Sequence, residues 1–242
     1  MRKVKFINDG IYHSYNRGVE KRDIFLDKQD YFRFIHDLFE FNDQAPAGKF
    51  SQFSQAQKQQ QSEVQQSEAG LPIVEPRKLL VEILAFCLMP NHYHLLLKQK
   101  REGGMVQFMQ KLGTGYTNYF NQKYKRVGGL FQGNFKAISV IQQDYLNYLL
   151  YYIHFNPLDL FELGWRVGEI NNYQKAIEFL NSYRWSSHLD YLGKKNFPSV
   201  TQRRFILKIL GGEENYQQSI ENWLKEMAIQ KDNKKFKIVS LE

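Results

Sequence analysis

The sequence predicts an α+β protein in which two helices back a four-stranded antiparallel sheet. Apolar runs with strand character and stretches with helical periodicity follow one another in the order strand, helix, strand, strand, helix, strand, helix. The first six elements match the split β-α-β, ferredoxin-like arrangement. The seventh element is an added helix, and a mostly helical C-terminal extension follows it.

The first half of the chain supplies three of the strands and the first helix. Residues 10–18 are bounded by glycines and alternate well enough to form a strand, and residues 27–42 carry aromatic side chains at helical spacing behind a capping aspartate. Two further strands, 81–89 and 92–98, are apolar runs separated by a Pro-Asn turn signal, so they predict a hairpin. Between the first helix and this hairpin, residues 44–77 are rich in Gln and Ser and predict a flexible insertion.

The second half predicts mostly helices. Residues 105–125 have helical periodicity, residues 130–141 have strand character, and residues 144–156 form a helix that Pro157 ends. Further helices are expected at residues 201–210 and 213–230, ahead of a basic end at residues 231–237.

The composition favours a polyanionic partner. A formal net charge of +8, a pI of about 9.3 and 15% aromatic residues suit nucleic acid, although a basic protein without such a partner also fits. The single cysteine, Cys87, rules out an internal disulfide framework and a cysteine-based zinc site. No run approaches the roughly 18 apolar residues that a membrane span needs, so a cytoplasmic protein without membrane contact is the default expectation.

A pair of histidines at the start of a strand is the first candidate for a functional site. Strand side chains alternate between faces, so His92 and His94 are expected to project from one side and Tyr93 from the other. Two neutral imidazoles fixed in this way can supply half of a metal coordination shell. They also fit a simpler interpretation, in which backbone carbonyls satisfy both rings. His13 could approach the same site, but a structural hydrogen bond explains a lone histidine equally well.

The helix at residues 144–156 is unusually rich in tyrosine. Tyr152 and Asn156 are four residues apart and therefore share a face, where a phenol and an amide can point at one site. Tyr151 is the alternative to Tyr152 as the functional tyrosine, because the two are adjacent. The other tyrosines fit an amphipathic core with their hydroxyls at its rim.

Four motifs in order resemble the single-tyrosine HUH transposases, and in particular their REP-associated tyrosine transposase branch. Residues 89–96, Met-Pro-Asn-His-Tyr-His-Leu-Leu, resemble the metal-binding signature of the family, and residues 152–157, Tyr-Ile-His-Phe-Asn-Pro, resemble its tyrosine helix. Residues 131–136, Phe-Gln-Gly-Asn-Phe-Lys, and 183–187, Tyr-Arg-Trp-Ser-Ser, look like further motifs of the branch. The resemblance spans about residues 8 to 193.

The resemblance implies a metal-dependent endonuclease and strand transferase that acts on single-stranded DNA, at a hairpin or palindrome. Mg²⁺ or Mn²⁺ would be held by His92, His94 and Asn156, and Tyr152 would form a 5′-phosphotyrosine intermediate. Tyr152 is preferred to Tyr151 because it stands four residues before Asn156, which matches the family spacing. The catalytic domain would be residues 1–160 with the insertion at 44–77, and residues 161–242 would be an extension that contacts DNA. A monomer and a homodimer both agree with the family.

Further basic or polar side chains are candidates for binding DNA, although those near the C-terminal end of the helix at residues 105–125 also fit a simple interaction with the helix dipole. They are Arg17, Lys111, Lys123, Arg126, Gln132, Lys136 and Arg184.

Two competing functions stay open. The same scaffold could bind single-stranded nucleic acid without cleaving it. A zinc hydrolase ranks last, because the histidine motif contains no Asp or Glu to complete the shell.

Overall fold

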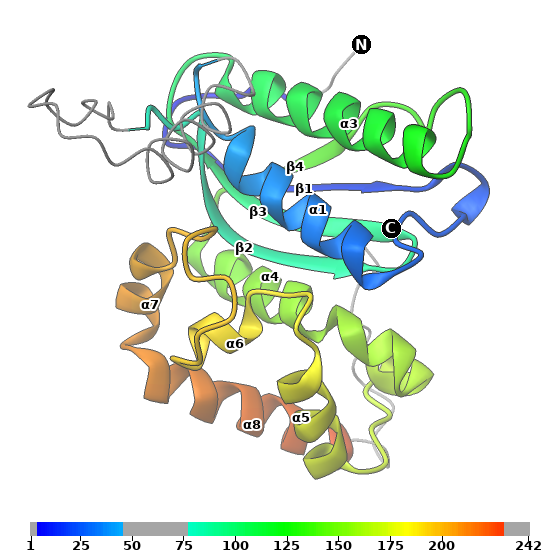
Figure 1. Ribbon diagram of the computed structural model, residues 1–242. Helices are drawn as coiled ribbons and strands as arrows, with labels where there is room; N and C mark the ends of the chain where they lie inside the picture. The colour runs from blue at the N-terminus through cyan, green and yellow to red at the C-terminus, as the bar shows by residue number, and fades with distance from the viewer. Residues whose placement is uncertain (1–3, 46–76, 230–242) are drawn as a thin grey trace, which may run out of the picture.

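The computed structural model describes residues 4–45 and 77–229 (Figure 1). The insertion expected at residues 44–77 lies almost entirely outside the described residues, and so does the basic segment at 231–237. The strands are β1 (Ile11–Arg17), β2 (Val81–Met89), β3 (His92–Gln99) and β4 (Lys136–Val140). The α-helices are α1 (Lys28–Glu40), α3 (Gly104–Lys123), α4 (Gln143–Phe155), α5 (Tyr173–Ser182), α6 (His188–Tyr191), α7 (Arg204–Leu210) and α8 (Glu213–Ile229). Short 3-10 turns are η1 (Val19–Lys21), η2 (Asn156–Leu160) and η3 (Leu163–Val167).

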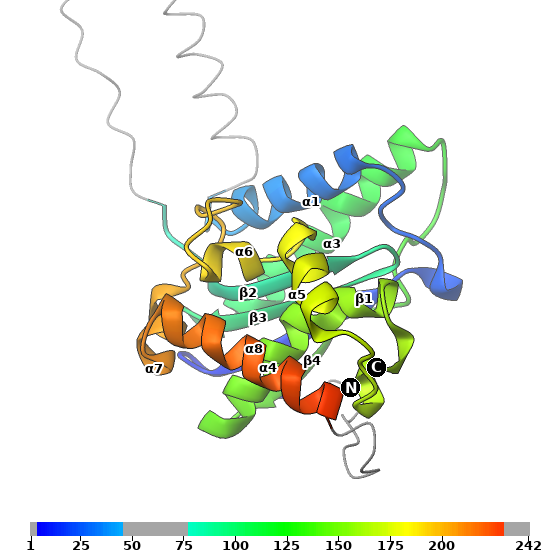
Figure 2. The ribbon, with the colours of Figure 1, turned by 90° about the horizontal axis from the view of Figure 1, so that it is seen from below.

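The four strands form one antiparallel sheet in the order β2-β3-β1-β4. Helices α1 and α3 cover one face of the sheet, and α4 covers the other (Figures 1 and 2). The predicted α+β class, with its ferredoxin-like four-stranded sheet, is therefore confirmed. Strands β3 and β1 are central, which places His94 opposite Tyr15 and His92 opposite Arg17 in the register.

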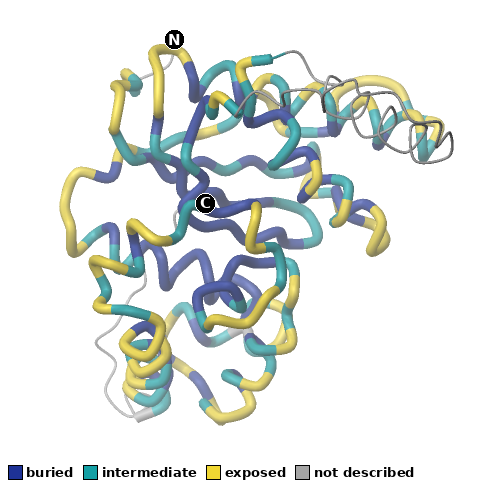
Figure 3. Tube along the Cα trace, turned by 60° about the vertical axis from the view of Figure 1, so that its left-hand side comes forward, coloured by how far each residue is buried: buried dark blue, intermediate teal, exposed yellow. Residues whose placement is uncertain are grey.

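The local sequence explains why the first elements form where they do. The Asp27 side chain accepts from the backbone N–H of Asp30, and the Asp30 side chain accepts in return, so a capping box starts α1. Strand β2 is apolar almost throughout because helices cover both of its faces, and eight of its nine residues are buried. The sheet consequently separates two hydrophobic clusters, and its strands run through the buried middle of the molecule (Figure 3).

The fourth strand is shorter than predicted. A strand was expected over residues 130–141, but β4 begins only at Lys136. Gly133 has a φ of +73°, in the left-handed region, and this interrupts an extended path. Residues before it still reach β1 through the backbone, because Gln132 N–H donates to the Arg17 carbonyl and Phe131 forms an isolated bridge with Gly18.

Residues beyond 160 pack on the face of the sheet that α4 covers. Most of their buried apolar side chains share one cluster with β2, β3 and α4, whereas Val200 joins the cluster on the other face. The backbone also extends to the edge of β2, where Leu88 N–H donates to the Trp185 carbonyl and Ser187 N–H donates to the Phe86 carbonyl. The helix expected at residues 201–210 begins at Arg204. The boundary between a catalytic domain and an extension after residue 160 stays a prediction.

A buried polar network fixes α4 against the C-terminal helices. His154 of α4 bonds the Ser187 hydroxyl at 2.8 Å and the Tyr216 hydroxyl at 2.7 Å, and Tyr216 bonds His188 at 2.7 Å. Burial lowers the pKa of His154 well below its usual range and that of His188 to about 3, so both rings are neutral. Within the described residues, no helix is both long enough and apolar enough to cross a membrane.

Candidate active site

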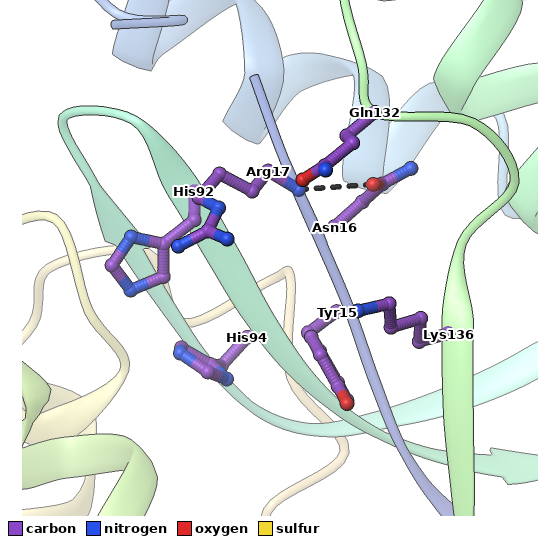
Figure 4. Close-up of a pocket in the computed structure, with 7 residues that line it drawn as sticks. All are labelled: Tyr15, Asn16, Arg17, His92, His94, Gln132 and Lys136. Carbon is purple, nitrogen blue, oxygen red and sulfur yellow. Dashed lines mark hydrogen bonds between the residues drawn. The ribbon is translucent and has the colours of Figure 1, made fainter. Parts of the chain in front are cut away.

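The histidine pair lies on the sheet face that α4 covers. His92 and His94 extend from β3 to the same side as Tyr15 of β1 (Figure 4), as the alternation of strand side chains predicts. Their ring centroids are 5.0 Å apart. His13 of β1 joins them, because its Nε2 lies 2.9 Å from His94 Nδ1, and the two rings stack at 5.1 Å.

Hydrogen bonds at Nδ1 orient both members of the pair. His94 Nδ1 contacts His13, and His92 Nδ1 lies 2.6 Å from the Asn91 side-chain oxygen. Burial lowers the pKa of His13 to about 3 and that of His94 well below its usual range, and the neighbouring His92 lowers the pKa of His94 further. His13 and His94 are therefore neutral at physiological pH, which is the form in which an imidazole binds a metal.

Helix α4 places Tyr152 over the histidines. The Tyr152 ring meets the His94 ring edge-on at 5.7 Å and the His13 ring at 6.2 Å. Tyr151 points the other way, because its ring packs on Tyr216 at 6.1 Å and on Trp223 at 5.4 Å in α8. Of the two adjacent tyrosines, Tyr152 is the one on the histidine side.

Asn156 follows one turn after Tyr152 and is fully buried. Its side-chain amide donates to the Tyr152 carbonyl at 2.8 Å, and its Oδ1 accepts from Arg166 Nη2 at 3.0 Å. Arg166 Nη1 also donates to the Tyr152 hydroxyl at 2.9 Å. Arg166 is a residue of this site that sequence reasoning missed, because it lies in η3, outside every motif.

The donor set fits a divalent cation in part. Two imidazoles on one strand suit Mg²⁺ less than the softer Mn²⁺, and Nε2 is the nitrogen of each ring that would coordinate. The Asn156 oxygen already accepts from a guanidinium, although a carbonyl oxygen has a second lone pair. In residues 4–45 and 77–229, no three or more His, Cys, Asp and Glu side chains gather closely enough to hold a metal ion. Coordination by Asn156 stays a prediction.

The predicted DNA-binding residues separate into two groups. Arg17, Gln132 and Lys136 line a pocket with His92 and His94 (Figure 4), which has an empty volume of about 380 Å³. Its remaining lining residues are Tyr15 and Asn16. The sheet thus brings three of the seven candidates to the histidines.

The other four candidates lie away from this pocket and have structural partners. Lys111 donates to the Asp43 and Ala45 carbonyls, and Lys123 forms ion pairs with the capping aspartates of α1. Arg126, just past the end of α3, donates to the Asn121 side chain of that helix. Arg184 lies over the rings of Phe32, Trp185 and Phe197.

A helical tyrosine that packs over a His-hydrophobe-His strand, on one face of a four-stranded antiparallel sheet, is the arrangement expected of a single-tyrosine transposase. Residues 75–156 match the family model described as "Transposase IS200 like". This segment, about a third of the chain, is similar to the IS200-like transposases. The matched residues include His92, His94, Tyr152 and Asn156, so the resemblance predicted from the motifs is confirmed over this range.

Two solved structures are similar to this chain at low identity. One is described as a REP-associated tyrosine transposase bound to a REP hairpin, with 12% identity, a TM-score of 0.44 and coverage of 82% of this chain and 88% of that one. The other is a putative transposase from Deinococcus radiodurans R1, with 13% identity, a TM-score of 0.33 and coverage of 63% and 95%. No curated protein matches the chain. The similarity to transposases therefore rests on the sequence match over residues 75–156.

Proposed function

We propose that this protein is a metal-dependent endonuclease and strand transferase for single-stranded DNA, acting at hairpin or palindromic sequences. The observation that carries the proposal is the position of Tyr152, whose ring lies 5.7 Å from His94 on a helix that faces the histidine strand. The family match supports it, because transposases break and rejoin DNA strands. The four sequence motifs also resemble those of the REP-associated branch.

The proposed reaction needs no energy source beyond the phosphodiester itself. The Tyr152 hydroxyl oxygen attacks the scissile phosphorus in line with the 3′ oxygen. A bond from phosphorus to the tyrosine oxygen forms while the bond from phosphorus to the 3′ oxygen breaks. The phenolic proton is lost and the 3′ oxygen gains one, so the products are a 5′-phosphotyrosine and a free 3′-OH. The reverse reaction joins a 3′-OH to the phosphotyrosine and completes strand transfer.

His92 and His94, with Asn156 as the third ligand, would hold Mg²⁺ or Mn²⁺. When bound, such a cation would supply positive charge to the non-bridging oxygens of the scissile phosphate. The protein supplies the rest of the geometry. Strand β3 fixes the imidazoles, and the His154–Tyr216 hydrogen bond anchors the tyrosine helix opposite them.

The pocket beside the histidines gives the DNA backbone a place to bind. Arg17 and Lys136 present positive charge at its rim, and Gln132 adds an uncharged polar side chain. Tyr15 offers an aromatic surface on which a base can stack. These contacts support binding of a single strand whose phosphate lies near His92 and His94.

A second candidate function is binding of single-stranded nucleic acid without cleavage. One observation favours it, because Tyr152 is only 1% exposed and its hydroxyl accepts from Arg166. Cleavage therefore requires that this tyrosine become accessible to the phosphate, whereas binding at the pocket does not.

Covalent trapping separates the two candidates. The protein is incubated with synthetic single-stranded hairpin oligonucleotides in Mn²⁺ or in EDTA, and DNA that stays on the protein after denaturation is measured. The transferase predicts an adduct in Mn²⁺ that Tyr152→Phe abolishes and Tyr151→Phe retains. Equal binding in EDTA with no adduct in any divalent ion would leave only the binding function. An adduct that survives Tyr152→Phe and disappears in Tyr151→Phe would show that Tyr151 is the nucleophile.

A further inference from the structure

Arg166 connects the two polar groups of the tyrosine helix. One amino group of its guanidinium donates to the Tyr152 hydroxyl at 2.9 Å, and the other donates to Asn156 Oδ1 at 3.0 Å. The guanidinium carbon lies 5.2 Å from the centre of the Tyr152 ring. Arg166 therefore contacts the oxygen that the proposed reaction uses as its nucleophile.

Asp159 holds this guanidinium in place. Its carboxylate accepts from Arg166 Nη2 at 2.6 Å and from Arg166 Nε at 2.9 Å, and it also accepts from the Trp165 indole N–H at 2.5 Å. Burial alone would lower the pKa of Arg166, but the bonds to Asp159 and Tyr152 hold it above its ordinary value. The guanidinium is thus a permanent positive charge with a fixed orientation.

The guanidinium is more exposed than the tyrosine that it contacts. The Arg166 side chain keeps 19% of its surface exposed, whereas Tyr152 is 1% exposed. Asp159 lines a second pocket together with Arg17 and His92, with an empty volume of about 820 Å³. Arg166 and Tyr152 do not line this pocket themselves, but Asp159, which accepts from the guanidinium, does.

We propose that Arg166 is a catalytic residue that binds the scissile phosphate at the Tyr152 hydroxyl, a role that rests on the proposed function of Tyr152 as the nucleophile. The planar guanidinium donates to non-bridging phosphate oxygens, a pairing that its geometry favours. As the phosphorus moves from the 3′ oxygen to the tyrosine oxygen, the transferred group stays within reach of the same donors. Arg166 keeps all its protons throughout. Asp159 competes with the phosphate for these donors and keeps them ordered until DNA binds.

DNA binding measured in EDTA, where the metal-dependent cleavage cannot occur, tests the phosphate contact. The probe is a fluorescent single-stranded oligonucleotide with one hairpin, titrated in EDTA at several salt concentrations. Arg166→Gln is expected to weaken binding about tenfold and to reduce the slope of log affinity against log salt by about 0.7, the value for one contact to single-stranded DNA. Arg33→Gln is the matched control, because it removes the same charge from an Arg–Asp pair on α1, across the sheet from Tyr152. It should keep the affinity and the slope of the wild type.

A second variant distinguishes phosphate binding from a structural role. Asp159→Asn also breaks the hydrogen-bonded cluster, so it should lose stability as Arg166→Gln does, yet it leaves the guanidinium present and less restrained. It is expected to bind the oligonucleotide at least as tightly as the wild type. Wild-type affinity and slope in Arg166→Gln would overturn the proposal, and so would equal weakening in Asp159→Asn. If Arg166→Gln does not fold, Arg166→Lys replaces it. That variant should keep the salt slope and form the adduct at least tenfold more slowly, since one ammonium cannot bridge Tyr152 and Asn156.

The adduct assay separates this proposal from the proposed function. If the wild type forms an adduct through Tyr152 and Arg166→Gln binds and reacts as the wild type does, Arg166 has no phosphate role while Tyr152 keeps its own. If the wild type forms no adduct, the EDTA titrations still decide whether Arg166 binds phosphate.

Discussion

Replacing His94 by alanine should lower the free energy of unfolding more than replacing His92 does. His94 is fully buried and bonded to the fully buried His13 at 2.9 Å, so His94→Ala removes a buried partner and leaves a cavity. A lost bond to a buried group costs about 1–3 kcal/mol, and the cavity adds to this, so the free energy of unfolding should fall by about 2–4 kcal/mol. His92 is only half-buried, and its Nδ1 lies against the side chain of the neighbouring Asn91. His92→Ala should therefore cost no more than about 1 kcal/mol.

Metal binding should respond to both substitutions equally. Each variant removes one of the two imidazoles that would hold the cation, so Mn²⁺ affinity should fall at least tenfold in both. Urea denaturation measures the stability, and a calorimetric Mn²⁺ titration measures the affinity. Equal stability losses in the two variants would refute the buried His13–His94 pair. Unchanged Mn²⁺ affinity in either variant would refute the assignment of that histidine as a ligand.

Three further predictions concern the scaffold. The pKa of His188 is about 3 in the folded protein and about 6.5 when unfolded, so its contribution to stability is complete above pH 6.5 and falls by about 2 kcal/mol between pH 7 and pH 5. When the free energy of unfolding is measured at several pH values, it should fall less steeply toward pH 5 in His188→Gln than in the wild type. His36→Gln, which replaces an exposed histidine, is the control. Gly115→Ala should lower the melting temperature, because a Cβ there would lie 2.3 Å from the ring of Phe41, at a cost of about 1–3 kcal/mol. Gly113→Ala, on the same helix with no atom within 4 Å of the added Cβ, should instead raise it slightly through better helix propensity. A raised melting temperature in Gly115→Ala would contradict the close packing.

Short-range signals predicted the parts of the fold that depend on neighbours in sequence. Residues 81–89 form a strand over the expected range because the run is apolar and the Pro-Asn turn follows it. Asp27 caps α1 because its carboxylate needs only a backbone N–H three residues away. The alternation of strand side chains likewise placed His92 and His94 on one side.

Contacts between distant segments were harder to predict. Sequence spacing could show that Tyr152 and Asn156 share a face, but the approach of Arg166 depends on the path of η2 and η3 over α4. The His13–His94 contact depends on the register of β1 against β3, which no local pattern fixes. Charge alone also could not tell Lys136, which lines the pocket, from Lys123, which pairs with the aspartates that cap α1.

Peptide mapping of a trapped complex tests the central claim most directly. The wild-type protein is reacted with a single-stranded hairpin oligonucleotide in Mn²⁺, the DNA is digested to a nucleotide remnant, and the proteolytic peptides are sequenced by mass spectrometry. A 5′-phosphonucleotide on Tyr152, absent when EDTA replaces Mn²⁺, is the predicted result. A remnant on Tyr151 or on any other residue, or a cleaved strand without a covalent remnant, would contradict the proposed reaction.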